Sequence, residues 1–315
     1  HASAGLVVVG SNNVAAERLL TDVDIALYAS KDRGRGRLEL FTDDMRTHLN
    51  GAHVTRTDLH HALERDELRL VYQPVVDLRT GVVSGVEALL RWAHPHRGTL
   101  APADFLVEAE ATGLIIPIGA WVLATALRDL GAWRTSTGRD VGVAVNLSAS
   151  QLADAGLVEL VVDTLRDTLI EAGALSVEIT ETALLRDVET AARDLEALRH
   201  LGVHVAIDDF GIGYSSLDYL RRLPVDILKI DRSFVSGVGR SEQSTAIVAT
   251  LTAMATSLRL TVVAEGVETA PQLDALRHLG CGLAQGYHLS KPLPADEIPR
   301  VLAQPIAAAR TPADR

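Results

Sequence analysis

The chain has 315 residues, of which 47% are hydrophobic and 23% charged, so it contains enough apolar material for a sizeable globular core. Its net charge of −11 and pI of about 5.4 argue against binding of polymeric nucleic acid, which requires a basic face. Cys281 is the only cysteine, which excludes an intrachain disulfide and favours a reducing compartment, so we expect a cytoplasmic location.

Residues 1–10 lack the charged start and the long apolar core of a secretory signal. The chain begins at His1 rather than at Met, and we expect it to be a piece of a longer protein whose upstream segments could attach it to a membrane. The longest uncharged stretch, residues 111–127, is barely long enough to cross a bilayer and is interrupted by glycine and proline. It predicts the start of a buried helix, and no membrane contact is expected from this fragment.

The first fifty residues differ from the rest of the chain. GLVVVG (5–10) and LELF (38–41) predict strands, residues 15–31 predict a helix, and RGRGR (33–37) predicts a solvated basic loop. Residues 1–50 are too few for a complete domain. Residues 51–67 predict a linker helix that leads into the next segment.

From residue 69 onward, short apolar runs alternate with helical patterns. The expected strands are 69–76, 83–90, 141–146, 175–180, 203–208, 225–230, 260–265 and 282–286. The expected helices are 117–135, 150–172, 188–201, 242–258 and 270–279. Eight strands that alternate with helices predict an α/β fold closed into a barrel. Only DLRTG (77–81) separates the first two strands, and a parallel crossover needs a dozen or more residues. We therefore expect an irregular (β/α)8 TIM-like barrel with one antiparallel strand.

Acidic and amide side chains follow or end these apolar runs. They are Glu87, Asn146, Glu178, Asp208, Asp209, Glu265 and Gln285, with Lys229 as the one cation of the series. Singly, such residues are most often helix caps or solvated groups. As a set they would converge at the mouth of a barrel, where the C-terminal strand ends meet, and they would repel one another unless cations lay between them. Oxygen ligands favour Mg²⁺ or Mn²⁺, and paired ions are a known device for displacement at phosphorus.

Two positions in this set leave alternatives open. Asp208 and Asp209 are adjacent, so a regular pleat would send their side chains to opposite faces, and only a distortion at the strand end would let both reach the mouth. Lys229 could be a solvated surface lysine, but its place inside an apolar run favours a buried group that holds an attacking water or acts as a base.

The motifs in this stretch resemble those of the EAL domain family. Glu87-Ala88-Leu89 lies within YQPVVDL…GVEALLRW, and the later segments follow in the order of the family: VNLS, EITE, DDFGIGYSSL, LKID, AEGVE and QGY. The resemblance covers residues 56–305 and leaves 306–315 as a tail. It implies an irregular TIM barrel that hydrolyses cyclic di-GMP to linear pGpG with Mg²⁺ or Mn²⁺, two per site, with Ca²⁺ inhibitory, and that forms a homodimer through this domain.

The resemblance also implies a role for each matching residue. Glu87, Asn146, Glu178 and Asp208 would bind one metal, and Asp208, Asp209 and Glu265 the second. Lys229 would orient or deprotonate the attacking water, with Gln285 supporting the water network and Glu181 anchoring the DDFG loop. The substrate contacts would be Gln73, Leu89, Arg91 and Asp231.

Two positions depart from the family pattern. Ile212 stands where the DDFG loop usually has threonine, and the segment around Val107 lacks a usual proline. Residues 1–48 resemble the C-terminal end of a GGDEF domain without the motif that names it, so no cyclase activity is expected from this chain.

Two alternative functions remain open at this point. One is a receptor that binds cyclic di-GMP with little turnover. The other, which needs no family resemblance, is a metal-free glycosidase that uses two of the carboxylates. The glycosidase leaves Asn146 and Lys229 without clear roles.

Overall fold

A computed structural model describes residues 3–8, 38–41, 58–184, 188–211 and 223–306, with a few positions between residues 19 and 30. Most of the expected helix at 15–31, the basic loop at 33–37 and the segment 212–222 with Ile212 lie outside the described residues.

The chain divides into two compact units. The first contains residues 1–66 with 103–112, and the second contains 67–102 with 113–315. In the first unit, β1 (Ala4–Leu6) pairs in parallel with β2 (Leu38–Leu40). The two apolar runs predicted strands here, although β1 begins earlier and is shorter than the run at residues 5–10. The domain boundaries inferred from the sequence stay predictions.

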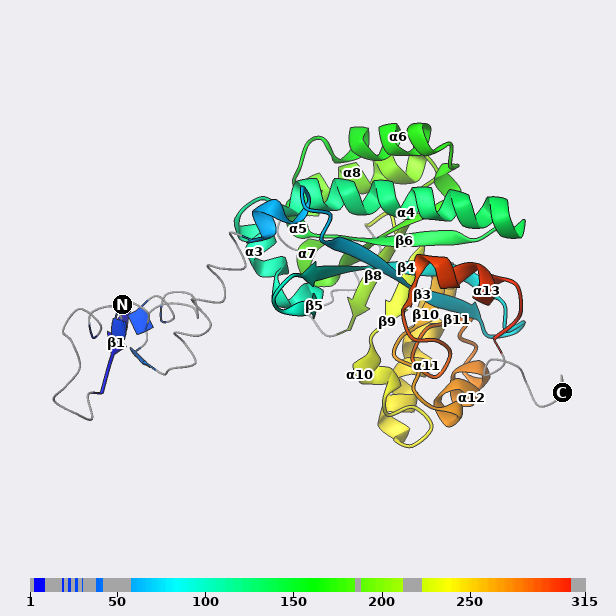
Figure 1. Cartoon of the computed structure of the whole chain (residues 1–315). Helices are drawn as coiled ribbons and strands as arrows, with labels where there is room; N and C mark the ends of the chain where they lie inside the picture. The colour runs from blue at the N-terminus through cyan, green and yellow to red at the C-terminus, as the bar shows by residue number, and fades with distance from the viewer. Residues whose placement is uncertain are drawn as a thin grey trace. The chain divides into compact units, whose positions relative to one another are not determined.

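The remaining elements follow the expected alternation of strands and helices (Figure 1). The strands are β3 (Leu68–Asp77), β4 (Val83–His94), β5 (Gly98–Leu100), β6 (Gly142–Leu147), β7 (Leu175–Thr180), β8 (His204–Phe210), β9 (Ile227–Ile230), β10 (Thr261–Ala264), β11 (Leu283–Ala284) and β12 (Leu293–Pro294). The α-helices are α3 (Leu106–Ala111), α4 (Ile115–Thr137), α5 (Ala149–Leu152), α6 (Leu157–Thr168), α7 (Glu181–Leu184), α8 (Val188–His200), α10 (Arg232–Val235), α11 (Glu242–Ser257), α12 (Ala270–His278) and α13 (Ile298–Leu302). Short 3₁₀ turns cover Pro102–Asp104, Ala172–Ala174 and Ala295–Glu297.

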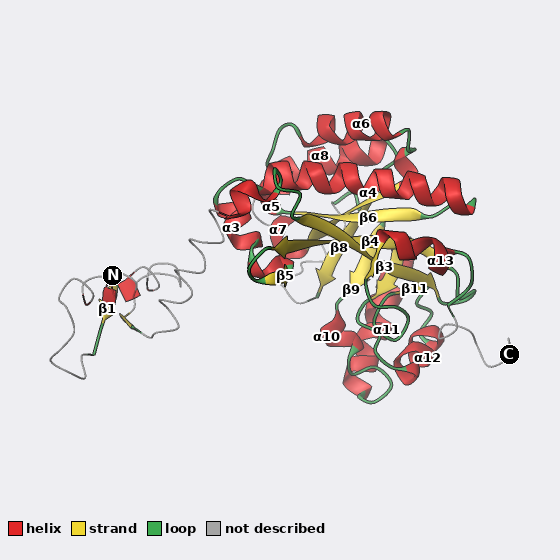
Figure 2. Cartoon of the chain, viewed as in Figure 1, coloured by secondary structure: helices red, strands yellow, loops and turns green. Residues whose placement is uncertain are grey.

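Eight of these strands close into a barrel, which confirms the predicted fold. The order is β3-β11-β10-β9-β8-β7-β6-β4, and β4 pairs again with β3. All neighbours are parallel except β3, which is antiparallel to both β4 and β11. Figure 2 shows the strands at the centre, with α4, α6 and α8 on one side and α11 and α12 on another.

The tight turn after β3 makes this strand antiparallel. The Asp77 carboxylate accepts hydrogen bonds from the backbone N–H groups of Arg79 (2.9 Å) and Thr80 (2.8 Å). Gly81 then takes a φ of 72°, a left-handed conformation that glycine adopts without strain. The chain therefore reverses at once, and β4 runs back beside β3.

Several expected elements differ in their bounds, such as the strand expected at 282–286, which is β11 (Leu283–Ala284), and two of the differences have a clear local cause. β4 continues to His94 instead of ending near residue 90, because its far end pairs with both β3 and β5. The single helix expected over 150–172 is two helices, α5 and α6. The Asp154 carboxylate accepts a hydrogen bond from Gly156 N at 3.1 Å, and this turn separates them.

Helix α4 contains most of the long uncharged stretch. By length and composition alone it could cross a membrane, with a mean hydropathy of 1.4. Its Ile118, Leu127 and Leu130 are almost completely buried, and the helix packs against β6 and α6. This packing is that of a barrel-wall helix, as the sequence predicts.

Tyr72 joins the antiparallel strand to this helix, and its loss should destabilise the fold. Tyr72 is fully buried, its ring meets Trp133 edge-on at 4.6 Å, and its hydroxyl donates to Asp129 at 2.5 Å. We expect Tyr72→Phe to lower the free energy of unfolding by about 1–2 kcal/mol, because a hydrogen bond to a charged group is lost. Urea unfolding measures this. Tyr287→Phe, at a side chain that is 59% exposed, is the control, and equal stabilities of the two variants would contradict the role of the bond.

Candidate metal and active site

The polar residues predicted at the strand ends do converge at one mouth of the barrel. Asn146, Glu178, Asp208 and Lys229 lie in the last three residues of their strands, and Glu265 and Gln285 directly follow β10 and β11. The placement of Glu87 at a strand end was wrong. Glu87 is the fifth residue of β4, because this strand continues beyond the barrel rim to pair with β5.

Lys229 occupies the centre of this group. Its ammonium lies 2.5 Å from Glu178, 2.6 Å from Glu265, 3.2 Å from Asp208 and 3.5 Å from Glu87. The side chain is only 3% exposed, which excludes a solvated surface lysine. One buried cation therefore balances part of the charge of four carboxylates from four different strands or strand ends.

Glu87 is held by two amides as well. Asn146 Nδ2 donates to one carboxylate oxygen at 2.8 Å, and Gln285 Nε2 donates to the other at 2.6 Å. The three residues come from β4, β6 and the end of β11, so these bonds join strands on the two sides of β4 and β3 in the barrel. These two hydrogen bonds also orient both amide groups, so that the amide oxygens point away from Glu87.

Gln285 reaches this position because a glycine follows it. A Cβ on Gly286 would lie 2.2 Å from the backbone N and O atoms of Val267, so no other residue fits there without a shift of the backbone. Val267 N in turn donates to Gln285 O at 3.1 Å. The close approach ties the end of β11 to the segment after β10 that carries Glu265.

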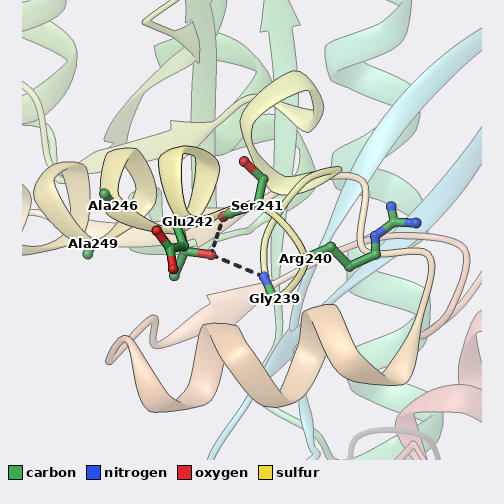
Figure 3. A pocket seen from close by; sticks show the side chains of 7 residues that line it. Gly239, Arg240, Ser241, Glu242, Ala246 and Ala249 are labelled. Atoms are coloured by element: carbon green, nitrogen blue, oxygen red, sulfur yellow. Dashed lines mark hydrogen bonds between the residues drawn. The ribbon is translucent and has the colours of Figure 1, made fainter.

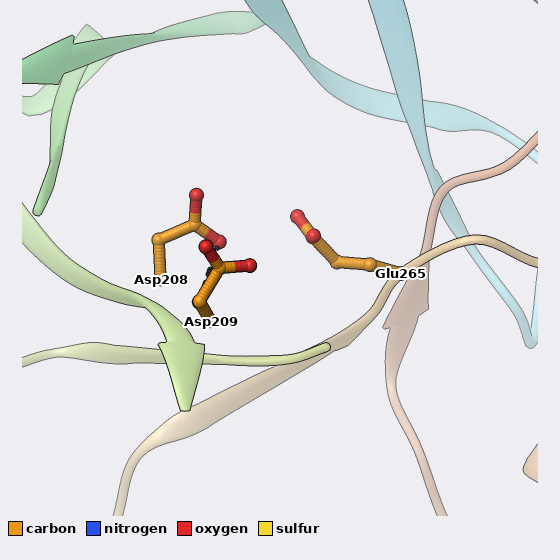
Figure 4. Close-up of side chains that lie close together, drawn as sticks. All are labelled: Asp208, Asp209 and Glu265. Atoms are coloured by element: carbon orange, nitrogen blue, oxygen red, sulfur yellow. Dashed lines mark hydrogen bonds between the residues drawn. The ribbon is translucent and has the colours of Figure 1, made fainter. Parts of the chain in front are cut away.

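A break in the strand pairing brings the adjacent aspartates to the same side. The register between β8 and β9 shifts between Ile207 and Phe210, and Asp209 has a left-handed φ of 54°, which aspartate tolerates better than most residues. Figure 4 shows both carboxylates directed toward Glu265. Oxygens of Asp208, Asp209 and Glu265 lie within 4.8 Å of one another, a spacing that a metal ion can bridge.

Burial and mutual repulsion shift the protonation of these carboxyls. Burial raises the pKa of Glu178 well above its usual value, although Lys229 opposes the shift. Burial, with repulsion from Asp208 and opposed by Lys229, raises the pKa of Glu265 to about 8. Burial and the neighbouring Asp208 raise the pKa of Asp209 to about 6. Burial also acts on Glu87, but Lys229 and the two amides outweigh it and lower its pKa.

Lys229 shows the opposite balance. Burial alone would lower its pKa, but the surrounding carboxylates, led by Glu178 and Glu87, raise the pKa well above the usual value. In the metal-free protein Lys229 is therefore a charged hydrogen-bond donor and not a base.

The donor set fits a hard divalent cation. Every candidate ligand offers oxygen, and the carboxylate charge exceeds what one ammonium can balance. The Gln285 Oε1 atom is buried and accepts no hydrogen bond from any residue in the described part of the chain. A bound cation or its hydration water would satisfy such an atom.

The predicted substrate residues lie on the same face of two paired strands. Across β3 and β4, Gln73 is opposite Glu87, Val71 is opposite Leu89, and Arg69 is opposite Arg91. The pairs use every second residue of each strand, so all three lie on the same face. They form a row that runs from the carboxylates toward the rim. Arg91 is half-buried and donates to Leu90 O at 2.7 Å. Sequence reasoning missed Arg69, whose only signal was its register with Arg91.

The other two predicted residues lie near the rim. Asp231 directly follows β9 and caps α10, accepting a hydrogen bond from Ser233 N at 2.8 Å. Glu181 is the first residue of α7 and is half-buried. The DDFG loop that it was expected to anchor lies largely outside the described residues.

A cavity of about 180 Å³ opens at the mouth between Gln73, Glu265 and Gln285. Arg232 and Glu268 line it and form a 2.6 Å ion pair that sequence reasoning did not identify. A larger hollow of about 400 Å³ lies at the start of α11, between Gly239 and Ala249 (Figure 3). It has no convergent carboxylates, so the mouth is the better candidate for chemistry.

Comparison with known proteins decides the family. The sequence profile of the EAL domain matches residues 56–292, three quarters of the chain. This chain belongs to the EAL domain family. The match agrees with the family resemblance that the sequence motifs indicated.

Two relatives and two solved structures show how widely the similarity extends. Two proteins of Pseudomonas aeruginosa, the bifunctional diguanylate cyclase/cyclic di-GMP phosphodiesterase MucR and the cyclic di-GMP phosphodiesterase NbdA, are 42% identical over 297 residues and 43% identical over 293 residues. The matches cover 94% and 93% of this chain but 43% and 37% of those proteins, so the chain spans less than half their length. The PaMucR phosphodiesterase in complex with c-di-GMP aligns with a TM-score of 0.74 and 46% identity, over 78% of this chain and 99% of that one. The EAL enzyme Bd1971, bound to cAMP and cyclic di-GMP, aligns with a TM-score of 0.78 and 29% identity, over 92% and 77%.

Metal binding by this EAL domain should strengthen as the pH rises from 6 to 8. Below pKa values of about 6 for Asp209 and about 8 for Glu265, each carboxyl holds a proton that a cation must displace. We expect the apparent Mn²⁺ affinity to rise at least about tenfold over this range, with proton release. Calorimetry in buffers of different ionisation enthalpy counts those protons. Glu265→Gln should flatten the dependence, and a pH-independent affinity in the unsubstituted protein would contradict the shifted pKa values.

Proposed function

We propose that this EAL domain hydrolyses cyclic di-GMP to linear pGpG with the help of two divalent cations. The observation that carries the proposal is the buried ring of four carboxylates around Lys229, next to the Asp208, Asp209 and Glu265 cluster. The relatives named for this activity, and the PaMucR structure with c-di-GMP, support the choice of substrate.

The proposed cations are Mg²⁺ or Mn²⁺, because the available ligands are oxygens. Glu87, Asn146, Glu178 and Asp208 would hold one, and Asp208, Asp209 and Glu265 the other, so Asp208 would bridge them. Paired cations supply charge neutralisation at the phosphodiester and a more acidic water. The bulge at Asp208 and Asp209 supports this assignment, because it presents both carboxylates to Glu265.

Lys229 would donate a hydrogen bond that orients the attacking water. The position of its ammonium among four carboxylates supports this role. Two bound cations would lower the pKa of Lys229, so deprotonation of the water is its alternative role. Gln285 would position the same water through its buried Oε1 atom. The dinucleotide would be contacted from the rim by Gln73, Leu89, Arg91 and Asp231. Of these, Arg91 is the residue best suited to bind a phosphate, because its guanidinium can donate paired hydrogen bonds to the phosphate oxygens. Glu181 would hold the DDFG loop.

The alternatives from the sequence are less well supported. A metal-free glycosidase needs two separate carboxylates of defined protonation, whereas the four carboxylates here share one ammonium. No observation in the described part of the chain favours a receptor without turnover.

Three further assignments are proposals from the sequence. Residues 1–48 would be the end of a GGDEF domain, as their resemblance implies; the match to the bifunctional diguanylate cyclase/cyclic di-GMP phosphodiesterase MucR extends beyond residues 56–315 into this segment. The domain would form a homodimer, as its family resemblance implies, and would act in the cytoplasm, as its single cysteine favours.

The activity itself is tested by incubating the purified protein with cyclic di-GMP. We expect linear pGpG with Mg²⁺ or Mn²⁺, and little or none with Ca²⁺, which prefers more ligands at longer distances. Chromatography of the nucleotides measures the product. Full turnover in excess chelator, or equal rates with Ca²⁺ and Mg²⁺, would contradict a two-cation site built for smaller ions.

Asp208→Ala should abolish turnover without unfolding the protein. The substitution removes the carboxylate that both metal sites would share, and we expect a loss of at least about 1000-fold, as for loss of an essential electrostatic group. Glu87→Ala and Asn146→Ala should behave alike. Asp163→Ala on the exposed face of α6 is the matched control and should keep full activity. Near-normal turnover in folded Asp208→Ala protein would refute the bridging role.

Lys229→Met separates an orienting role from simple charge balance. Methionine keeps much of the apolar stem and removes the ammonium, and turnover should fall at least about 100-fold if Lys229 positions the water. Cyclic di-GMP binding in Ca²⁺ should persist. A titration of the rate against Mg²⁺ distinguishes the two roles, because recovery at saturating Mg²⁺ would mean that Lys229 only balances charge.

A further inference from the structure

A third cavity lies beneath the four carboxylates around Lys229, at the opposite end of the barrel from the mouth. It has a volume of about 320 Å³ and its lining includes both Glu178 and Lys229. Its other lining residues come mainly from the first residues of the parallel strands, such as Ser84, Gly142, Ser176 and His204. It therefore connects the N-terminal face of the barrel with the inner side of the ring.

Small residues leave this space open. Three small residues each lie two positions before a polar residue of the mouth on the same strand: Gly85 before Glu87, Ala144 before Asn146 and Ser176 before Glu178. Because side chains alternate along a strand, all three face the barrel interior. In a TIM barrel the layers of side chains in the interior are normally filled by bulky branched residues. Here the three small residues come from neighbouring strands β4, β6 and β7, and all three are partly exposed. The bulky residues Ile227, Val263 and Leu283 of β9, β10 and β11 line the other side of the cavity.

The cavity has charged residues at both ends. Its inner end is lined by Glu178 and Lys229, whose side chains are 5% and 3% exposed. At its outer rim, Arg134 pairs with Asp140 at 2.6 Å, and His204 and Asp140 are exposed. Apolar cavities stay dry, but a cavity with polar partners holds water, and this one has room for about ten molecules at ~30 Å³ each.

We propose that this lower cavity is a water entrance to the active site, which supplies the water consumed when the dinucleotide covers the mouth. The inference rests on the proposed hydrolysis. Each turnover uses one water: its oxygen bonds to phosphorus, the bond from phosphorus to the ribose oxygen breaks, one proton ends on the released hydroxyl and the other leaves from the new phosphate. A substrate bound at the mouth would cover the carboxylates from above, whereas the lower cavity is lined by Glu178 and Lys229 from below.

Cysteine accessibility tests the entrance without any need for activity. Ser176→Cys places a thiol in the lower cavity, and Val71→Cys places one on the mouth face opposite Leu89. Buried Cys281 serves as the internal negative control. Each protein is treated with methyl methanethiosulfonate, with and without saturating cyclic di-GMP and Ca²⁺, and labelled peptides are quantified by mass spectrometry. Ala144→Cys replaces Ser176→Cys if the latter fails to fold.

With ligand bound, we expect labelling at Val71→Cys to slow by at least about tenfold, while labelling at Ser176→Cys changes by less than about twofold. A thiol at position 176 as unreactive as Cys281 would show that water does not fill the cavity. Slowing at 176 equal to that at 71 would show that access runs only through the mouth. Either result overturns the proposal.

A blocking experiment then tests the supply role. A benzyl adduct on the Ser176→Cys thiol should lower turnover by at least about tenfold relative to the methyl adduct. Cyclic di-GMP binding in Ca²⁺ should stay unchanged. The matched control is a benzyl adduct on Ser257→Cys, on the exposed face of α11, which should have no effect. Unchanged turnover with the benzyl adduct at 176 would refute the supply role. If the unmodified protein shows no turnover, the proposed function fails, while the labelling result still decides whether the entrance exists.

Discussion

The buried ammonium of Lys229 is the interaction on which the mouth of the barrel depends. It contacts Glu178 and Glu265 at 2.5–2.6 Å and lies within 3.5 Å of Asp208 and Glu87. Four carboxylates in a space of low polarity would otherwise repel one another and take up protons, as the raised pKa values of Glu178 and Glu265 show. A single lysine keeps the set together but leaves excess negative charge. A divalent cation would balance that excess.

The barrel supplies this arrangement through two departures from a regular (β/α)8 pattern. The reversed strand β3 brings Gln73 opposite Glu87 and begins the row that runs toward Arg91. The bulge at the end of β8 turns Asp209 to the side of Asp208. Each departure has a local cause, the Asp77 turn in one case and a left-handed aspartate in the other. Irregular backbone of this kind can turn a side chain toward a face that it would not reach from a regular strand.

The barrel interior below the four carboxylates also departs from the usual TIM-barrel packing. Three small residues on adjacent strands replace part of the bulky layer that fills most barrels of this kind, and Glu178 and Lys229 line the resulting cavity. The base of the barrel is therefore part of the environment of Lys229 and Glu178.

The sequence by itself determined the fold class and indicated most of the polar residues that meet at the mouth. Apolar runs of strand length, the short DLRTG turn and polar residues near the ends of those runs are local signals, and they predicted the closed barrel, its antiparallel strand and the ring from Glu87 to Gln285. Only the tertiary structure decided the rest. The position of Glu87 within a longer β4 depends on pairing with β5, and the shared face of Asp208 and Asp209 depends on a register shift with β9. The partners of Lys229 and the hollow base depend on distances between strands far apart in the chain. Such contacts carry no signal in local periodicity, because they arise only when the barrel closes.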